Sequence, residues 1–214
     1  MVAVGTVAVG NGLVPVGNVG SVGVVGVVGT DATVTVLEDG SYTFSASDFG
    51  FSDPNDSPAN SFSAVKIATL PAAGTLKLSG VAVTAGQSVP VASLGNLVFT
   101  PSANANGAGY ASFTFQVQDN GGTSNGGVDL DQSANTITVN VTSVNDAPAG
   151  ADKTVTVLED GSHTFSAADF GVSDTSDSPA NALSAVVIAT LPANGTLTLD
   201  DVSGHVEART GDGS

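Results

Sequence analysis

The sequence has no cysteine, no tryptophan and few positive charges. Four Lys and Arg residues stand against 20 Asp and Glu residues, a formal net charge of −16 over 214 residues. A nucleic-acid-binding surface is excluded, because neutralising phosphates requires clustered Lys and Arg. Disulfide frameworks and thiolate metal sites are excluded by the absence of cysteine. No uninterrupted apolar run reaches the ~18 residues of a membrane-spanning helix, so no membrane insertion is predicted.

Glycine and apolar residues are abundant instead. The chain has 27 Gly and is 41% hydrophobic, which is too apolar for a chain that is disordered throughout. Residues 1–30 form a separate zone, in which 12 Val and 8 Gly occupy 20 of the 30 positions and no residue is charged. Because frequent glycine raises the entropic cost of ordering, we expect a disordered low-complexity lead over 1–30.

An internal repeat organises the rest of the chain. Residues 31–78 align without gaps to residues 152–199, with 37 identities in 48 positions and an offset of 121 residues. This length suits one β-sandwich module. The alignment predicts a complete first module over 31–146 and, after a linker over 147–151, a truncated second module over 152–199. Residues 200–214 match nothing in the first copy and are expected to be an unrelated tail.

Short strands separated by turn residues are predicted in the first module, and no helical periodicity is present. The fold class is therefore all-β, a β-sandwich. In the last two strands apolar residues alternate with polar ones and would share one face: Phe113, Phe115 and Val117 in the first, Ile137, Val139 and Val141 in the second. The predicted strands span 33–37, 42–46, 62–70, 75–78, 81–84, 97–100, 111–118 and 136–142.

Acidic residues gather in turns at the ends of these strands. With so few cations in the chain, grouped carboxylates would repel one another, and a calcium ion would remove that repulsion. Ca²⁺ takes about six to eight oxygens from carboxylates, amide carbonyls and backbone. For each cluster an alternative stays open, since Asp, Asn and Gly also favour turns. The candidate Ca²⁺ ligands are Glu38, Asp39, Asp53, Asp56, Asp119, Asn145, Asp146, Glu159, Asp160, Asp174 and Asp177.

Sandwich topology predicts where these residues lie, because alternate loops are at opposite ends of the module. Glu38 and Asp39 are expected at the same end as Asn145 and Asp146, where the chain leaves the first module. The loop 173–177 of the second module would face the same junction. A linker held by Ca²⁺ in this way becomes a stiff joint. A further acidic pair, Asp129 and Asp131, is a candidate metal pair, although a solvated loop is the preferred interpretation.

Several motifs resemble one family. The segments LEDG, SDPNDSP, LPAAGTLKL, LVFTPSANANGAG, FTFQVQDNGG and VTSVNDAP occur in this order and resemble the cadherin-like, immunoglobulin-like tandem repeats of large bacterial surface adhesins of the RTX type. The resemblance covers 31–199. It implies that an Asn-Asp-x-Pro linker and acidic strand-end residues bind Ca²⁺ between modules. The residues implied here are Glu38, Asp39, Asn145 and Asp146, with Asp174 and Asp177 from the neighbouring module. The linker is shorter than the paired-Asn linker of animal cadherins, and none precedes the first module.

The sequence thus predicts a non-enzymatic, calcium-binding structural repeat of a secreted or cell-surface protein, acting as a stiffened spacer in cell adhesion. Its expected partners are neighbouring repeats of the same chain, with polysaccharide of the cell surface or matrix as an open possibility. The alternative is a carbohydrate-binding β-sandwich, although only Tyr42 and Tyr110 accompany the nine Phe for stacking on sugars. No activated nucleophile accompanies the paired carboxylates, so no enzyme is predicted.

Overall fold

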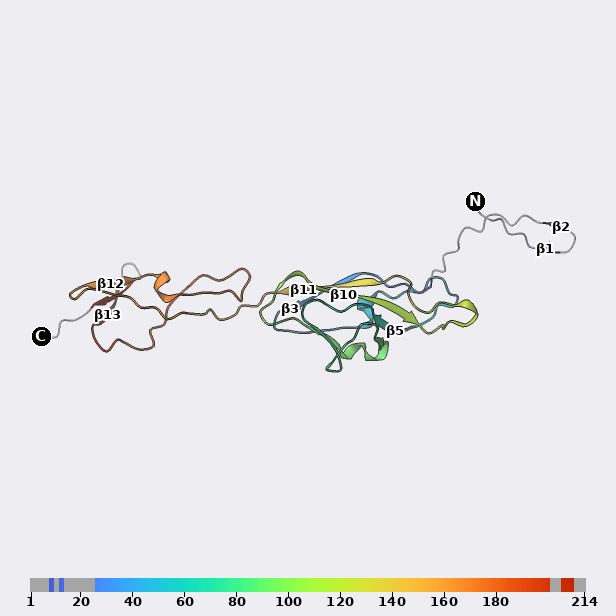
Figure 1. Cartoon of the computed structure of the whole chain (residues 1–214), viewed down its shortest axis with the longest axis horizontal. Coiled ribbons are helices and arrows are strands. Elements are labelled where there is room, and N and C mark those ends of the chain that lie inside the picture. Colours follow the sequence, from blue (N-terminus) through green and yellow to red (C-terminus); the bar gives the residue numbers. More distant parts are fainter. Residues whose placement is uncertain (1–7, 10–11, 14–25, 201–204, 210–214) are drawn as a thin grey trace.

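The computed structural model describes residues 8–9, 12–13, 26–200 and 205–209. The predicted lead therefore falls mostly outside the described residues; within it, β1 (Ala8–Val9) pairs with β2 (Gly12–Leu13). The two modules follow each other end to end (Figure 1), joined by the linker after β11. None of the helices among the described residues is long and apolar enough to cross a membrane.

The first module is a sandwich of two sheets, as predicted. Strand β3 pairs with β11 in parallel, and all other pairs in the two sheets are antiparallel. One sheet has the order β3 (Ala32–Leu37), β11 (Asn135–Thr142), β10 (Gly107–Asp119), β5 (Phe62–Ile67), β8 (Ser88–Pro90). The other has the order β4 (Tyr42–Thr43), β9 (Leu97–Thr100), β6 (Thr75–Leu78), β7 (Val81–Ala82).

The alternating residues of β10 and β11 form the centre of the core. Phe115, Val117, Ile137 and Val139 are fully buried, which confirms the predicted faces of these strands. Edge-on aromatic contacts pack Phe49, which follows β4, against Phe115 of β10, with ring centroids 4.9 Å apart. Each large apolar side chain buried in this way contributes about 1.5–3 kcal/mol relative to exposure.

Residues 26–30, which precede the predicted start of the module, take part in this core. Val27 is only 1% exposed, and Val28 exchanges two backbone hydrogen bonds of 2.9 Å with Ser52. The Gly29 amide donates to Asp131 Oδ2 at 2.9 Å. Asp131 is 2% exposed, so the prediction of a solvated loop is wrong at this position. Its carboxylate also accepts hydrogen bonds from nearby Ser and Asn side chains, which satisfy it after burial.

The structure differs from the predicted strands at several places in the first module. The strand predicted over 42–46 stops at Thr43, and a 3₁₀ turn, η1 (Ala46–Phe49), follows. Asp48 accepts a hydrogen bond from the Ser45 amide at 2.7 Å, which closes this turn and inserts Phe49 into the core. Strand β8 was not predicted, and η2 (Val91–Asn96) connects it to β9.

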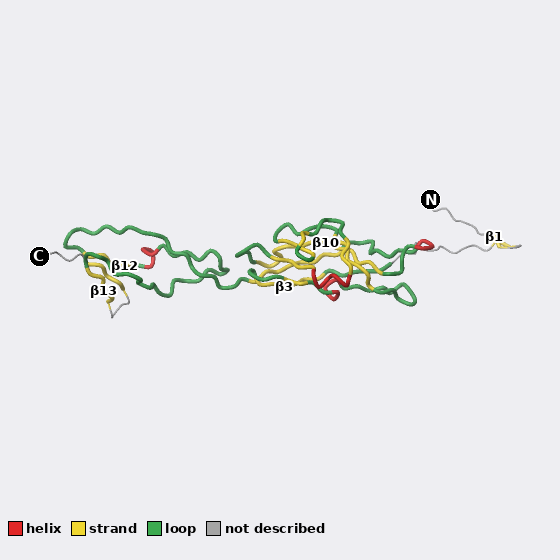
Figure 2. Tube along the Cα trace, turned by 90° about the horizontal axis from the view of Figure 1, so that it is seen from below, coloured by secondary structure: helices red, strands yellow, loops and turns green. Residues whose placement is uncertain are grey.

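The second module contains one sheet of three strands in the order β12 (Ser162–Phe165), β14 (His205–Arg209), β13 (Thr196–Asp200), and a 3₁₀ turn, η4 (Ala167–Phe170). By the repeat offset, β12 and β13 correspond to β4 and β6. Strand β14, in the segment predicted to be an unrelated tail, lies between them as β9 lies between β4 and β6. Most of the rest of this module runs as loops (Figure 2).

Candidate metal centres

Glu38, Asp146 and Asp177 form a carboxylate cluster between the modules, called here the junction cluster. One oxygen of each lies within 4.8 Å of the others. The parallel pairing of β3 with β11 explains the position of Glu38, because Leu37 and Thr142 are register partners and both strands end at the same pole. The linker that follows β11 therefore passes beside Glu38, and the second module contributes Asp177.

Glu38 is almost completely buried and holds the linker. Its Oε1 accepts hydrogen bonds from the Val144 amide at 2.6 Å and from Ser143 Oγ at 3.2 Å, and its Oε2 accepts one from Asn106 Nδ2 at 3.0 Å. The Val144 hydrogen bond, followed by that of Asn106, lowers the pKa of Glu38, so the group is a carboxylate at neutral pH. A carboxylate has about four acceptor positions. Three are occupied here, which leaves one on Oε2 for a cation.

The ionised side chain of Asp146 is electrostatically unfavourable at its position in the linker. Its Oδ2 is buried and has no hydrogen-bond partner among the described residues. Burial raises the pKa of Asp146, and the negative charges of Asp39 and Glu38, followed by those of Asp177 and Asp174, raise it further. The only contact at salt-bridge distance in the described part of the chain joins His163 to Asp169 elsewhere in the second module, at 3.5 Å. A divalent cation at the junction cluster would therefore neutralise charge that no described Lys or Arg neutralises.

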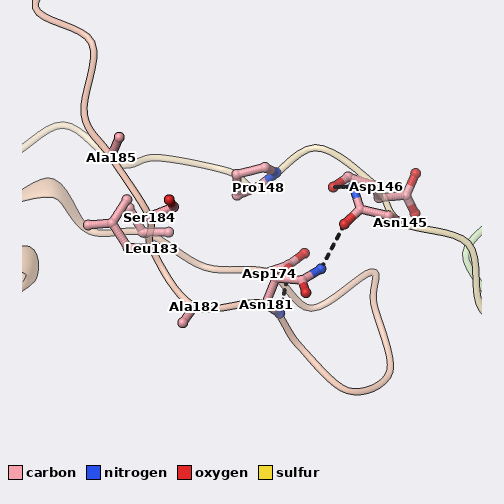
Figure 3. A pocket seen from close by; sticks show the side chains of 10 residues that line it. Asn145, Asp146, Pro148, Asp174, Asn181, Ala182, Leu183, Ser184 and Ala185 are labelled. Carbon is pink, nitrogen blue, oxygen red and sulfur yellow. Dashed lines mark hydrogen bonds between the residues drawn. The ribbon is translucent and has the colours of Figure 1, made fainter.

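Direct hydrogen bonds also join the linker to the second module. The Asp146 amide donates to Asp177 Oδ1 at 2.8 Å. Asn181 Nδ2 donates to Asn145 Oδ1 at 2.9 Å, as Figure 3 shows. Asn145, Asp146, Asp174 and Asn181 line a pocket with the chain segment 182–185. Asp174 is 8% exposed, and its Oδ1 is buried without a partner among the described residues. The pocket thus presents an unsatisfied carboxylate oxygen.

A second cluster, called here the distal cluster, lies at the opposite end of the first module and consists of Asp53, Asp56 and Asp119. One oxygen of each lies within 4.8 Å of the others. Asp119 ends β10, whose last residue pairs with Phe62 at the start of β5. Burial raises the pKa of Asp119, and Asp53 is among the charges that raise it further, while a hydrogen bond from the Gly121 amide lowers it. Asp53 Oδ1 is buried and has no partner among the described residues.

The loops that carry these residues have the same geometry in both modules. The Asn60 amide donates to Asp53 Oδ2 at 2.6 Å, and the Asn181 amide donates to Asp174 Oδ2 at 2.7 Å. Their side chains donate in turn to Asp56 and Asp177. The sequence prediction missed both Asn residues, although the shared segment DSPAN contains them. Rotation of either amide would present its oxygen to a cation.

The structure brings nine of the eleven predicted ligands to the two ends of the first module. Asp39 is exposed beside the junction cluster, close enough to raise the pKa of Asp146. Asn145 and Asp174 line the junction pocket. Glu159 and Asp160 occupy an exposed turn of the second module and belong to neither cluster within the described residues.

The match to a known family covers the first module. Residues 23–142 match the family described as a bacterial Ig domain, an immunoglobulin-like domain. The match begins before Val27, in agreement with the burial of that residue in the core. The comparisons with curated proteins and with solved structures found no match.

Proposed function

This chain belongs to the bacterial Ig domain family, and from that premise we propose that it is a structural repeat of a bacterial surface adhesin, stiffened by Ca²⁺ between its modules. Domains of this family typically occur in extracellular or surface proteins, and the family indicates a structural repeat. Ca²⁺ binding, the role in adhesion, the lack of enzymatic activity and the cadherin-like and RTX-type relationship are parts of the proposal.

The junction cluster is the observation that carries the proposal. Its three carboxylates come from a strand end, the linker and the second module. A cation bound by all three would therefore connect two modules whose described residues share a few hydrogen bonds. Asp146 Oδ2 and Asp174 Oδ1 are buried oxygens that still need a partner. Such oxygens are the ligand type that Ca²⁺ prefers.

The expected stabilisation is moderate. Extracellular calcium modules have Kd values of about 10⁻⁴–10⁻³ M. At a free calcium concentration ten times Kd, one site adds about 1.4 kcal/mol to the free energy of unfolding. Most of the benefit would therefore be mechanical, because the ion limits bending at the linker.

Small-angle scattering of the full chain in millimolar Ca²⁺ and in EDTA tests the proposal. We expect a longer maximum dimension and a narrower distance distribution with Ca²⁺. Asp177→Asn should abolish this difference, whereas Asp160→Asn should preserve it, because Asp160 is exposed and lies in neither cluster. Identical profiles of the unmodified chain in the two buffers would refute the stiffening.

The carbohydrate-binding alternative has less support. Tyr42 Oη donates a hydrogen bond to Asp48, and its ring packs edge-on against Phe44. Tyr110 Oη accepts a hydrogen bond from the Ser102 amide, and its ring packs against Phe99. Both rings are thus engaged within the module, so neither is a free platform for a sugar.

A further inference from the structure

The chain enters the two modules in the same way. Val28 exchanges two backbone hydrogen bonds of 2.9 Å with Ser52, and Ala149 exchanges two of 2.8 Å with Ser173. The two pairs are related by the repeat offset of 121 residues. Residues 24–27, which precede the first module, therefore correspond to residues 145–148 of the linker that precedes the second.

The corresponding positions differ in the side chains that they offer to a cation. Asn145 and Asp146 line the junction pocket, and Asp146 belongs to the junction cluster. Their counterparts in the sequence are Val24 and Val25, whose side chains contain no oxygen. A cation at the distal cluster would thus receive no side-chain ligand from residues 24–27.

Each carboxylate of the distal cluster has one oxygen left for a cation. The Asn60 amide and Asn60 Nδ2 donate to Asp53 Oδ2 and Asp56 Oδ2, and the Gly121 amide donates to Asp119 Oδ1. The second oxygen of each carboxylate accepts no hydrogen bond from the described residues, and that of Asp53 is buried in a residue only 8% exposed. These three oxygens are fewer than the about six to eight that Ca²⁺ takes, so several coordination positions would remain for an outside ligand.

Two aromatic side chains lie beside the distal cluster. Phe62 is the register partner of Asp119, and Phe51 directly precedes the loop that carries the other two carboxylates. Their rings stack with centroids 4.7 Å apart and planes at 14°, and both residues are half-buried, so part of each remains exposed. Their counterparts, Val172 and Leu183, line the junction pocket (Figure 3). The pole that lacks side-chain ligands from its preceding segment thus carries an aromatic pair in place of aliphatic residues.

The charge of the distal cluster limits the kind of ligand. Three carboxylates around one Ca²⁺ leave a net negative charge, and among the described residues no Lys or Arg lies at salt-bridge distance from them. An anionic ligand would therefore be repelled. Neutral sugar hydroxyls offer the oxygen ligands that Ca²⁺ takes, and the apolar C–H face of a sugar ring packs on aromatic side chains.

We propose that the distal cluster binds a neutral saccharide through Ca²⁺, with two adjacent hydroxyls of the sugar in the open coordination positions and the C–H face of the sugar against Phe51 and Phe62. The site rests on the Ca²⁺ binding that belongs to the proposed function, but not on stiffening of the junction. It also differs from the carbohydrate-binding alternative considered above, which would use Tyr42 and Tyr110.

Surface plasmon resonance of the full chain over immobilised mannan, galactan and dextran, in millimolar Ca²⁺ and in EDTA, tests the site. We expect binding to at least one of these neutral polysaccharides in Ca²⁺, and binding at least about tenfold weaker in EDTA. Asp56→Asn should weaken the binding in Ca²⁺, because Asp56 belongs to the distal cluster. Asp177→Asn should leave it unchanged, because Asp177 belongs to the junction cluster.

Two variants separate the sugar contact from the cation. Phe51→Val and Phe62→Leu introduce the residues that the second module has at these positions. Each should weaken saccharide binding about threefold or more, because an aromatic contact is lost. The calcium-dependent rise in the Tm of the first module should persist in both variants, which shows that the module is folded and that the cation still binds. Asp160→Asn is the control for a change of surface charge.

Each result supports or overturns the saccharide site. Calcium-dependent binding to a neutral polysaccharide that Asp56→Asn and the Phe variants reduce supports it. The site is overturned if no neutral polysaccharide binds, if binding is equal in EDTA, if both Phe variants bind as tightly as the unmodified chain, or if the acidic polysaccharide alginate binds more tightly. Binding that Asp177→Asn removes also overturns it, because the junction would then be the site. Identical scattering profiles in Ca²⁺ and EDTA, with saccharide binding retained, would refute the stiffening alone.

Discussion

The two modules share 37 of 48 aligned residues, yet the counterparts of β3 and β5, residues 153–158 and 183–188, form no strands in the second module. The segment TVTVLEDG contains most of β3 in the first module, where Val34 is 6% exposed; in the second it is irregular, and Val155 is 37% exposed. The acidic loops, in contrast, keep the same hydrogen bonds in both modules. Strands thus depend on distant partners, whereas these loops are encoded within a few residues.

The largest expected effect is on stability, and it compares a Phe that occupies corresponding positions in the two modules. Phe49 is 0% exposed and packs against Phe115, so Phe49→Ala should lower the free energy of unfolding of the first module by about 3–5 kcal/mol. Phe170, its counterpart, is half-buried, and Phe170→Ala should cost about 1 kcal/mol or less. Urea titrations of both variants measure the difference. Equal losses would mean that the second module has a core as well packed as the first.

Native-state hydrogen exchange compares the modules without mutation. Amides of β10 and β11 should exchange at least about 100-fold more slowly than those of 153–158 and 183–188, because backbone groups without a strand partner open at little cost. Mass spectrometry of peptic fragments resolves the two regions. Similar protection in both would show that the second module folds independently.

These differences show what sequence can predict. Strands β6 and β9 have the predicted bounds, since apolar residues bounded by turn formers mark them clearly. The early end of β4 depends on one side chain, Asp48, which turns the chain by a hydrogen bond that no periodicity reveals. In the second module, residues 153–158 and 183–188 have a composition typical of strands, but they form none because no described segment pairs with them.

The same distinction applies to the candidate site. Glu38 and Asp146 were predicted to meet because strand order alone brings them to one pole, and their oxygens do lie together. The roles of Asn60 and Asn181 depend on backbone amides and on loop closure, which a residue pattern does not specify. Asp131 was mistaken for a solvated residue because its partner, the Gly29 amide, is 102 residues away along the chain.

The two carboxylate clusters should respond separately to Ca²⁺. All ligands of the distal cluster are in the first module. Asp56→Asn should therefore reduce the calcium-dependent rise in the Tm of that module, because about 1.4 kcal/mol of calcium-dependent free energy of unfolding is lost. It should leave the calcium-dependent scattering change intact. Asp177→Asn should remove the calcium-dependent scattering change and leave the calcium-dependent rise in the Tm of the first module intact. Calorimetry and scattering on both variants measure these effects, and a single variant that removes both would show that the clusters act as one site.

The smallest expected effect is the change in Tm caused by Asp146→Asn, which depends on pH and reverses its sign when calcium is bound. The pKa of Asp146 is raised in the folded chain, so ionisation of Asp146 destabilises the fold as pH rises from its unfolded pKa through its folded pKa. The pKa of Glu38 is lowered, so the stability that Glu38 contributes is lost as pH falls through its folded pKa. In EDTA, Asp146→Asn should therefore raise the Tm near pH 7 and leave it unchanged near pH 3. In saturating Ca²⁺ the same variant should melt below the unmodified chain, because it has lost a charged ligand. Asp160→Asn is the matched control. A Tm of Asp146→Asn that is lower in both buffers would mean that Asp146 stabilises the junction without an ion.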